Sequence, residues 1–464
     1  MKIIELLKVL EKYEVVGHLG NYEIKETDVT QLHHDSRKVV VGSMFFCLDG
    51  TCVSGVKFAW EAVKNGAVCV ITEEWQESIH VVQIVVPDVR EAMSLMAKCF
   101  YGSMVNEMRV IGVVGTNGKT TCAHIMKHIL ETAGERVGIL GTLHGVMTTP
   151  DPIDLHRTIK EMHTEGIRVV VMEVSAHAIH FKKVAGITFE VVIFTNITQD
   201  HLDFFGTFDK YADTKVGFML GEDIKTAVIN TGNEFGRKIM SERKGSSIEY
   251  ALCDVQLFPD RSVIGEFDVN LPARFNAENA LGCIAAAKVL VIEGPIIKQA
   301  LKSIPRIPGR FNVFKLGDVT VIIDFAHSPD GLEKIIMSVK EFATKKVITV
   351  FGCGGNRDKG KRPAMGEISA RLSDFTVITS DNPRFERPIS IMKQIRKGFK
   401  AQKNKNFTMV VDRVKAIEYA LGFAQEGDIV IIAGKGGETY TEIKGRMIEY
   451  ADESVIATHI RNGV

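Results

Sequence analysis

The sequence predicts an α/β protein of three domains, in which parallel sheets are covered by helices. Short apolar, β-branched runs alternate with helical segments along most of the chain, and such alternation produces parallel sheets with right-handed crossovers. A glycine-rich turn joins one of these strands to a helix, as in folds that bind phosphate. At 464 residues the chain is too long for one ordinary core, so about three domains are expected.

The first domain is expected at residues 1–104. Residues 1–13 alternate apolar and charged side chains at helical spacing, which predicts an amphipathic helix rather than a signal peptide. Residues 43–48 and 67–72 are predicted strands with helices between them.

The second domain is expected at residues 105–308, with a central parallel sheet like that of P-loop ATPases. Its predicted strands are 110–114, 169–174 and 189–194. Its predicted helices are 119–133, ended by Gly134, then 209–220 and the alanine-rich 276–291.

The third domain is expected at residues 309–464, after a proline- and glycine-marked junction at 307–310. Strands at 319–324, 347–351, 375–379 and 429–433 alternate with helices. This pattern predicts a second doubly wound, Rossmann-like unit.

The composition narrows the classes of partner. Lys plus Arg equals Asp plus Glu, 57 against 57, so no bulk basic field exists to hold nucleic acid or an anionic membrane. The eight cysteines show no paired metal-ligand spacing and indicate reduced thiols. No stretch approaches the ~18 apolar residues of a membrane span. We therefore expect a cytoplasmic monomer that acts on small molecules.

The glycine-rich turn is the strongest single signal in the sequence. Backbone N–H groups and a helix N-terminus would face the phosphates of ATP, Lys119 would neutralise their charge, and the Thr120 hydroxyl would bind Mg²⁺. The alternative is a glycine-rich loop without function. Val113 stands where the first glycine of the common P-loop belongs, which points away from the usual GTPases and kinases. The residues expected to bind ATP here are Gly115, Thr116, Asn117, Gly118, Lys119, Thr120 and Thr121.

Other motifs follow this loop in order along the chain. They are Thr148–Asp151, Met172–Ala178, Phe194–Ile197 with Gln199–Asp203, Leu271–Asn276, Asp324–Asp330 and Phe351–Pro363. Together with the loop, these motifs resemble those of the Mur ligases, and within that family the MurE type. The resemblance implies an ATP-dependent ligase that adds meso-2,6-diaminopimelate to UDP-MurNAc-L-Ala-D-Glu through an acyl phosphate, in peptidoglycan precursor synthesis.

Glu173 and His201 each follow a predicted strand, at the sheet edge where α/β proteins bind ligands. A carboxylate and an imidazole there suit a divalent cation, although a lone histidine is more often structural. By resemblance, Lys215 is the family's carbamylated lysine, whose carbamate would supply oxygen to Mg²⁺; the residue alone suggests a solvated helix lysine. The expected metal ligands are Thr120, Glu173, His201 and Lys215, and the expected catalytic residues are Lys119, Lys215 and His201.

The resemblance also assigns the nucleotide and precursor contacts. It places Asn279 near adenine, and Arg310 and Asp324 near the phosphates and ribose; the alternative for Asn279 is a surface helix residue. In the first domain, Ser36 is a candidate ligand of UDP. The residues expected to hold the muramoyl dipeptide are Thr148, Thr149, Ser175 and Lys183.

The segment Asp381-Asn382-Pro383-Arg384 is, in that family, the motif that separates diaminopimelate-adding from lysine-adding enzymes. Diaminopimelate carries a second amino-acid head, whose carboxylate suits a bidentate guanidinium. Arg384 and Arg357 can supply it, while Glu438 can take the ammonium. The alternative is a turn with a surface arginine. The expected amino-acid ligands are Arg357, Asp381, Asn382, Arg384, Gly434 and Glu438.

Four positions depart from the family pattern. Lys183 stands for a usual Arg, Gly437 for His, Asn356 for Asp and Ala273 for Gly. Residues 141–148 also lack the hairpin often seen there, and residues 249–271 look shorter than the family norm. Two alternatives therefore stay open, namely a related amide ligase acting on another carboxylate or with another amino acid, such as a folylpolyglutamate-synthase-like or secondary-metabolite enzyme, and a non-catalytic binding module.

Overall fold

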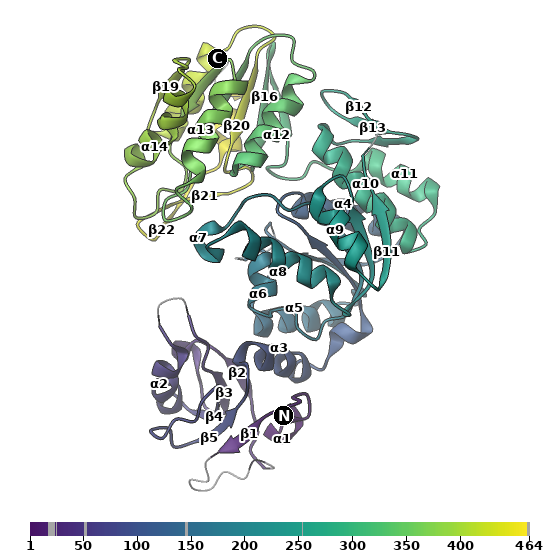
Figure 1. Cartoon of the computed structure of the whole chain (residues 1–464), viewed down its shortest axis with the longest axis vertical. Coiled ribbons are helices and arrows are strands. Elements are labelled where there is room, and N and C mark those ends of the chain that lie inside the picture. Colours follow the sequence, from purple (N-terminus) through teal and green to yellow (C-terminus); the bar gives the residue numbers. More distant parts are fainter. Residues whose placement is uncertain (17–23, 25, 51–52, 144–146, 253, 462–464) are drawn as a thin grey trace. The chain divides into compact units, whose positions relative to one another are not determined.

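The computed structural model describes residues 1–16, 24, 26–50, 53–143, 147–252 and 254–461. The chain divides into two compact units (Figure 1). The first contains Met1–Gly112, Glu135–Val191 and Gly221–Lys225, and the second contains Val113–Gly134, Val192–Leu220 and Thr226–Val464. The division into domains at 104 and 308 therefore stays a prediction.

The N-terminal part of the first unit contains a five-stranded sheet with the order β1-β5-β4-β3-β2. All neighbouring pairs are parallel except β1 with β5. The strands are β1 (Glu14–Val16), β2 (Gln31–His33), β3 (Ser43–Phe46), β4 (Ala67–Thr72) and β5 (Val82–Val85). The helices are α1 (Ile3–Leu7), η1 (Ser36–Lys38), η2 (Gly55–Phe58), α2 (Ala59–Lys64), α3 (Val89–Phe100) and η3 (Met104–Glu107).

The long helix expected at residues 1–13 is wrong. Helix α1 ends at Leu7, the chain turns with the Leu10 N–H donating to the Leu7 carbonyl at 3.1 Å, and Glu14–Val16 pairs with β5. Residues 8–13 form the turn that leads into β1, whose two consecutive valines suit an extended backbone, and a helix this short is marginal without further packing. The strand expected at 43–48 is present and ends at Phe46.

A second, six-stranded sheet has the order β11-β10-β9-β6-β8-β7. Its strands are β6 (Arg109–Val114), β7 (Val137–Leu140), β8 (Val169–Val174), β9 (Phe189–Phe194), β10 (Ile224–Asn230) and β11 (Ser246–Tyr250). The segments between them contain α4 (Lys119–Thr132), α5 (Pro152–Thr164), α6 (Ala176–His180), α7 (Leu202–Phe205), α8 (Phe208–Leu220) and α9 (Glu234–Glu242). The three strands and the helix after the glycine-rich turn that were expected here are confirmed.

The segment 249–271 forms the end of β11 and a small antiparallel sheet. This sheet contains β12 (Gln256–Leu257), β13 (Ser262–Ile264) and β14 (Phe267–Val269). It is followed by α10 (Arg274–Val289) and α11 (Gly294–Ser303). Of the segment expected to lack a hairpin, residues 144–146 lie outside the described residues.

The C-terminal sheet has the order β15-β16-β20-β17-β18-β19 and is parallel except at β15 (Figure 1). Its strands are β15 (Asn312–Leu316), β16 (Val319–Asp324), β17 (Val347–Phe351), β18 (Phe375–Ile378), β19 (Phe407–Met409) and β20 (Ile429–Ala433). The other elements are α12 (Pro329–Lys340), α13 (Lys361–Leu372), α14 (Pro388–Ala401), α15 (Arg413–Phe423), the hairpin β21 (Tyr440–Ile443) with β22 (Arg446–Glu449), and α16 (Asp452–Arg461).

Alternate residues of this sheet enter two separate cores. Ile322 packs in one core with residues of α12, α13 and α14, while Val321 and Ile323 pack in the other with α15 and α16. A parallel sheet covered on both faces needs strands that are apolar throughout. Its strands can therefore be recognised in the sequence as continuous apolar runs. The expected doubly wound unit is confirmed.

Candidate functional site

The glycine-rich turn between β6 and α4 depends on two glycines. A Cβ at Gly115 would lie 1.8 Å from the Thr195 Oγ1 atom, so the loop packs too closely there for any side chain. Gly118 has φ of +89° and precedes α4, and a Cβ at this position would lie 2.3 Å from the Asn279 Oδ1 atom. Asn279 is therefore a buried neighbour of the loop, and its reading as a surface residue is wrong.

Lys119 and Thr120 begin α4 and lie against the loop. The Lys119 amine donates to the carbonyls of Gly115 and Thr116, each at 2.8 Å. Arg310 donates from Nη2 to the Thr120 hydroxyl at 3.1 Å. A residue that follows α10 in the sequence therefore contacts the first turn of α4. Three cationic and polar groups thus gather at a helix N-terminus, where an anion is favoured.

The strand β9 and the residues after it support the loop from the side. The Asn117 N–H donates to Asn196 Oδ1 at 3.0 Å, and the Thr195 hydroxyl donates to the Asn117 carbonyl at 2.6 Å. The Thr198 N–H donates to the Thr116 hydroxyl at 3.0 Å. The motif at 194–197 was recognised in the sequence, and these bonds show that it holds the loop.

Lys215 lies on α8 with its side chain almost wholly buried, which rules out the solvated helix lysine. Its amine donates to the Tyr211 hydroxyl oxygen at 2.5 Å and to the Thr116 hydroxyl at 3.4 Å. Burial, reinforced by the positive charge of Lys119, holds the pKa of the Lys215 amine well below its usual range. Tyr211 was not singled out in the sequence, because its position one helical turn before Lys215 becomes meaningful only inside the fold.

His201 precedes α7 with a left-handed φ of 55°. Its Nε2 atom lies 3.6 Å from Asp200 Oδ2, and its N–H donates to Asp200 Oδ1 at 2.9 Å. Burial opposes the charge of Asp200, but His201, His327 and Lys361 outweigh it and hold the pKa of that carboxyl below its usual range. Lys361 donates to the His327 carbonyl at 2.9 Å; both residues lie in motifs identified in the sequence, but neither was assigned a role there.

Asp330, at the start of α12, contacts the loop directly. Its Oδ2 atom accepts from Asn117 Nδ2 at 2.7 Å and from the Thr198 hydroxyl at 3.4 Å, and it lies 3.1 Å from the Lys334 amine. The phosphate loop and the C-terminal sheet are therefore linked inside the second unit.

Asp324 ends β16 and is buried. Its two carboxylate oxygens accept the N–H groups of Phe311 and Ala326, each at 2.8 Å, and burial raises the pKa of its carboxyl. The Arg310 guanidinium lies 4.3 Å from the ring centre of Phe325. Asp324 thus shapes the turn beside Arg310, and its contact with ribose stays a prediction.

Glu173 ends β8 in the first unit. Its Oε1 accepts from the Thr142 N–H at 2.9 Å and its Oε2 from the Thr142 hydroxyl at 3.2 Å. A Cβ at Gly141 would lie 2.2 Å from Oε1, so glycine is required for this carboxylate to sit where it does. The sequence did not single out Thr142.

The residues expected to hold the dipeptide also lie in the first unit, and several contact one another. The Thr149 hydroxyl donates to the Glu173 carbonyl at 2.8 Å and to the Ser175 Oγ at 3.3 Å. Thr148 lies with its hydroxyl 3.0 Å from that of Thr142. The Lys183 amine lies 2.8 Å from Asp151 Oδ1. Ser36, in η1, donates instead to Glu61 at 2.6 Å.

The segment after β18 forms a polar cluster in the C-terminal sheet. Asn382 donates from Nδ2 to Glu438 Oε2 at 2.8 Å and accepts at Oδ1 from the buried Lys435 amine at 2.9 Å. A Cβ at Gly434 would lie 2.7 Å from Asp381 Oδ2. Four of the six expected amino-acid ligands are therefore together.

Arg384 has a left-handed φ of 50° and makes two contacts that fix its guanidinium. Its Nε lies 2.8 Å from Glu442 Oε2, and its Nη1 donates to the Gly355 carbonyl at 3.0 Å. A Cβ at Gly354 would meet Arg384 Nη1 at 2.9 Å and Arg357 Cγ at 3.7 Å, so both arginines border Gly354. Glu442 was missed, because nothing in its local sequence marks it as the partner of Arg384.

A buried ion pair lies behind this cluster. Arg413 donates from Nε and Nη2 to the two carboxylate oxygens of Asp452 at 2.8 and 2.7 Å, and both side chains are almost wholly buried. The same guanidinium donates to the carbonyls of Ala433 at 3.0 Å and Ser380 at 3.4 Å. Tyr450 donates to Asp452 Oδ1 at 2.7 Å. Ser380 directly precedes Asp381, and Ala433 directly precedes Gly434. The network therefore fixes the backbone of the two segments that enter the cluster.

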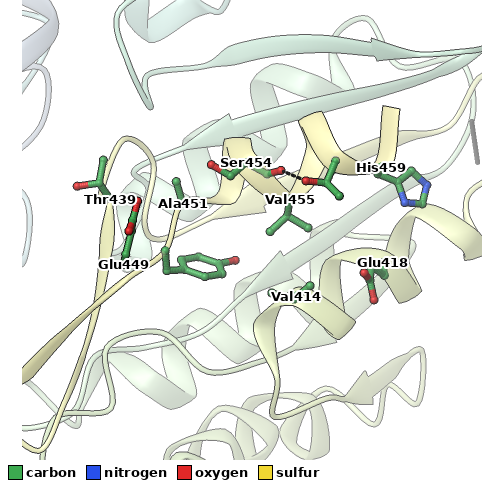
Figure 2. Close-up of a pocket in the computed structure, with 10 residues that line it drawn as sticks. Val414, Glu418, Thr439, Glu449, Ala451, Ser454, Val455 and His459 are labelled. Atoms are coloured by element: carbon green, nitrogen blue, oxygen red, sulfur yellow. Dashed lines mark hydrogen bonds between the residues drawn. The ribbon is translucent and has the colours of Figure 1, made fainter. Parts of the chain in front are cut away.

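A hollow of ≈ 480 Å³ lies nearby, between α15, α16 and the end of β22 (Figure 2). Glu418, His459 and Thr439 are among its lining side chains, and Tyr450 also lines it. None of the expected site residues lines it, and the only bond drawn inside it joins Thr458 to the Ser454 carbonyl at 2.9 Å.

Within the described ranges, no group of three or more His, Cys, Asp or Glu side chains is arranged to hold a metal ion. The expected ligands Thr120, His201 and Lys215 lie in the second unit and Glu173 in the first. The six cysteines among the described residues are free thiols. No helix in that part of the chain is long and apolar enough to cross a membrane.

Comparison with known proteins decides the family. Models of the Mur ligase family match three spans, the catalytic domain at 28–101, the middle domain at 113–287 and the glutamate ligase domain at 309–436. A UDP-N-acetylmuramoyl-L-alanyl-D-glutamate–2,6-diaminopimelate ligase of Clostridium botulinum is 38% identical, over 94% of this chain and 97% of its own. The chain belongs to the Mur ligase family.

Relatives with the same name cover this Mur ligase from end to end. That of Geobacillus thermodenitrificans is 38% identical over 99% of both chains, and that of Syntrophomonas wolfei 36% over 100% of both. A solved structure of such a ligase aligns over 99% of both chains with a TM-score of 0.67 and 27% identity. The ADP complex of MurF from Thermotoga maritima shares the fold, at 20% identity over 88% of this chain and 94% of its own, with a TM-score of 0.61.

The structure shows the surroundings of three positions at which this Mur ligase departs from the family pattern. Ala273 has φ of 80°, a conformation that glycine adopts without strain. Gly437 lies close to Pro308, whose carbonyl oxygen would be 3.0 Å from a Cβ, so a side chain at this position would require Pro308 to shift by a few tenths of an ångström. Lys183 keeps a single ion pair with Asp151 where arginine could make two bonds.

Asn356, the fourth departure, has a left-handed φ of 52°, which asparagine tolerates better than most residues. Its Oδ1 atom accepts the Phe385 N–H at 3.0 Å. The amide oxygen of Asn356 therefore accepts the same hydrogen bond that the carboxylate of an aspartate could accept at this position.

Proposed function

We propose that this Mur ligase uses ATP to join meso-2,6-diaminopimelate to UDP-MurNAc-L-Ala-D-Glu in peptidoglycan precursor synthesis. The observation that carries the proposal is the polar cluster around Asn382 and Arg384, which offers a guanidinium beside carboxylates. Relatives with this activity in their names match the chain over nearly its whole length. The three family-matched spans would bind, in order, the uridine nucleotide, ATP and the amino acid.

The chemistry requires that a carboxylate be activated. An amine does not displace hydroxide from a carboxylate at neutral pH, whereas an acyl phosphate has a good leaving group. Lys119 and the N-terminus of α4 would offset the charge that gathers when the γ-phosphate meets the substrate carboxylate. Arg310 would act on the same phosphates, since it already reaches the Thr120 hydroxyl.

The predicted ligands fit Mg²⁺ by the chemistry of their donors. The Thr120 hydroxyl and the Glu173 carboxylate offer the oxygens that a hard cation prefers, and Thr142 and Gly141 fix the orientation of Glu173. Bound Mg²⁺ would neutralise charge on the phosphates and polarise the transferred group.

We further propose that Lys215 is carbamylated. An amine must be neutral to add to CO₂, and burial lowers the pKa of this amine. Incubation with ¹³C-bicarbonate should produce a carbamate signal in ¹³C NMR that is absent from Lys215→Met. Identical spectra for the two proteins would exclude the modification.

The decisive experiment measures phosphate release with ATP, Mg²⁺, UDP-MurNAc-L-Ala-D-Glu and a panel of amino acids. Release with diaminopimelate but not with lysine is expected, because lysine has no distal carboxylate for Arg384. No release with any amino acid would refute the cell-wall role. That result would favour a related amide ligase that acts on another carboxylate. The specific indication for such an enzyme is Lys183, which stands in place of the usual arginine among the residues expected to hold the dipeptide. We place the reaction in the cytoplasm and expect a monomer.

A further inference from the structure

We propose that Asp330 is a positioning residue for ATP, whose carboxylate holds the phosphate loop in its binding shape through the side chain of Asn117. The inference rests on one part of the proposed function, namely that this loop binds the phosphates of ATP. It is independent of the amino acid that the enzyme adds. The motif that contains Asp330 was identified in the sequence, but no role was given there to this carboxylate.

Asn117 is held at its backbone by the two residues that follow β9. Its N–H donates to Asn196 Oδ1 at 3.0 Å, and its carbonyl accepts from the Thr195 hydroxyl at 2.6 Å. These bonds fix the backbone of Asn117 but not its amide, whose Nδ2 atom donates to Asp330 Oδ2 at 2.7 Å. The next residue, Gly118, has a left-handed φ of +89° and leads directly into α4. The side chain of Asn117 therefore has to be fixed if the N–H groups of the first turn of α4 are to face the phosphates.

Asp330 is itself held in place by the start of α12. The Ser328 side chain caps this helix by accepting the Gly331 N–H at 3.1 Å. Asp330 lies in the first turn, where the positive end of the helix favours a carboxylate. Its Oδ2 atom also lies 3.1 Å from the amine of Lys334, one turn later. The carboxylate thus has a defined place from which it can orient the loop.

The charge of Asp330, taken alone, gives the opposite expectation. A carboxylate beside a phosphate loop repels a triphosphate, so its removal would strengthen nucleotide binding if the side chain made no other contribution. Lys334 and the N-terminus of α12 offset this charge, and the Asp330 side chain keeps 24% of its surface exposed to screening by water. Its bond to the Asn117 amide is short and charge-assisted, whereas the other partner of that amide, the Thr198 hydroxyl, lies at 3.4 Å. We therefore expect positioning to outweigh repulsion.

The test measures binding of β,γ-methylene-ATP, an analogue that is not hydrolysed, to the full chain with Mg²⁺ by isothermal titration calorimetry. Asp330→Ala should weaken binding by roughly 10- to 100-fold, the range expected for a hydrogen bond to a charged group. Asp330→Asn keeps an oxygen that can accept from the Asn117 amide, so its Kd should stay within about 5-fold of the wild type. A role confined to the stability of α12 would lower Tm without separating the two variants in nucleotide affinity.

Asp412→Ala is the matched control, because Asp412 also begins a helix of this sheet, where its carboxylate caps α15 by accepting the Lys415 N–H at 3.1 Å. It should leave the affinity within about 2-fold, as for a substitution away from the loop, and Asp330→Ala should lower Tm no more than this control does. The inference is overturned if Asp330→Ala binds the analogue as tightly as the wild type or more tightly, if Asp330→Asn loses as much as Asp330→Ala, or if Asp412→Ala loses equally. Wild-type protein that does not bind the analogue would instead refute the ATP-binding role of the loop, which belongs to the proposed function.

Discussion

Asp452→Asn tests whether the buried ion pair supports the amino-acid site. The substitution keeps the shape of the side chain but removes the negative charge that Arg413 contacts through two hydrogen bonds of 2.8 and 2.7 Å. Arg413 would keep its bonds to the carbonyls of Ser380 and Ala433, which cannot neutralise it. The expected result is a lower free energy of unfolding and weaker binding of the amino acid.

The magnitude follows from the burial of both partners. Removing one member of a buried pair leaves an uncompensated charge and typically costs about 3–5 kcal/mol in the free energy of unfolding. An amide can still accept one hydrogen bond from the guanidinium, so the lower end, about 3 kcal/mol, is expected here. The KM for diaminopimelate should rise, because Ser380 and Ala433 directly precede two residues of the site, whereas the KM for ATP should change little.

Urea unfolding of the full chain, followed together with steady-state kinetics, measures both effects. Glu333→Gln is the matched control, since its pair with Arg371 lies next to the same sheet but is partly exposed, and pairs near the surface contribute about 0–1 kcal/mol. If Asp452→Asn costs no more than this control, the buried pair is not important for stability. If stability falls without any change in the KM for diaminopimelate, the network does not reach the site.

Three further predictions concern single side chains. Arg384→Ala should raise the KM for diaminopimelate by about 100-fold or more, because two charge-assisted hydrogen bonds are lost, and should leave ATP binding unchanged. Steady-state kinetics with each substrate varied in turn would measure both effects. An equal loss of ATP binding would mean that the role given to Arg384 is wrong. Lys215→Met should lower phosphate release more than about 100-fold without lowering Tm, because burying the amine opposes folding; a fall in Tm of several degrees would contradict this reasoning. Burial, with the positive charge of Lys98, lowers the pKa of His156 from 6.5 to about 4, so the unfolded chain binds this proton more tightly and stability falls as pH drops from 6.5 towards 4. His156→Gln should lose that dependence, by about 1.4 kcal/mol per pH unit in urea unfolding, and slopes that match the wild type between pH 7 and 5 would refute it.

The elements that could be predicted from the sequence are those whose signal is local. β4, β8, β9, β16, β17 and β20 agree with the expected strands at both ends, because a strand buried on both faces needs a continuous apolar run. The phosphate loop was equally legible, since its glycines are required by the backbone itself. The helix expected at 1–13 is too long because residues 8–13 form the turn before β1, and β1 is positioned by its pairing with β5, which lies about 70 residues away in the sequence.

By itself, the sequence determined the fold class, the phosphate loop and which short motifs belong to the site. Only the tertiary structure decided what those motifs touch. Tyr211 beside Lys215, Glu442 beside Arg384 and Asp452 beside Arg413 carry no local mark, and Asn279 became a neighbour of Gly118 only when α10 packed against α4. Backbone geometry and strand burial depend on a few consecutive residues, so a short stretch of sequence is enough to predict them. Charge pairing acts through space, so its partners are set by the packing of elements far apart in sequence.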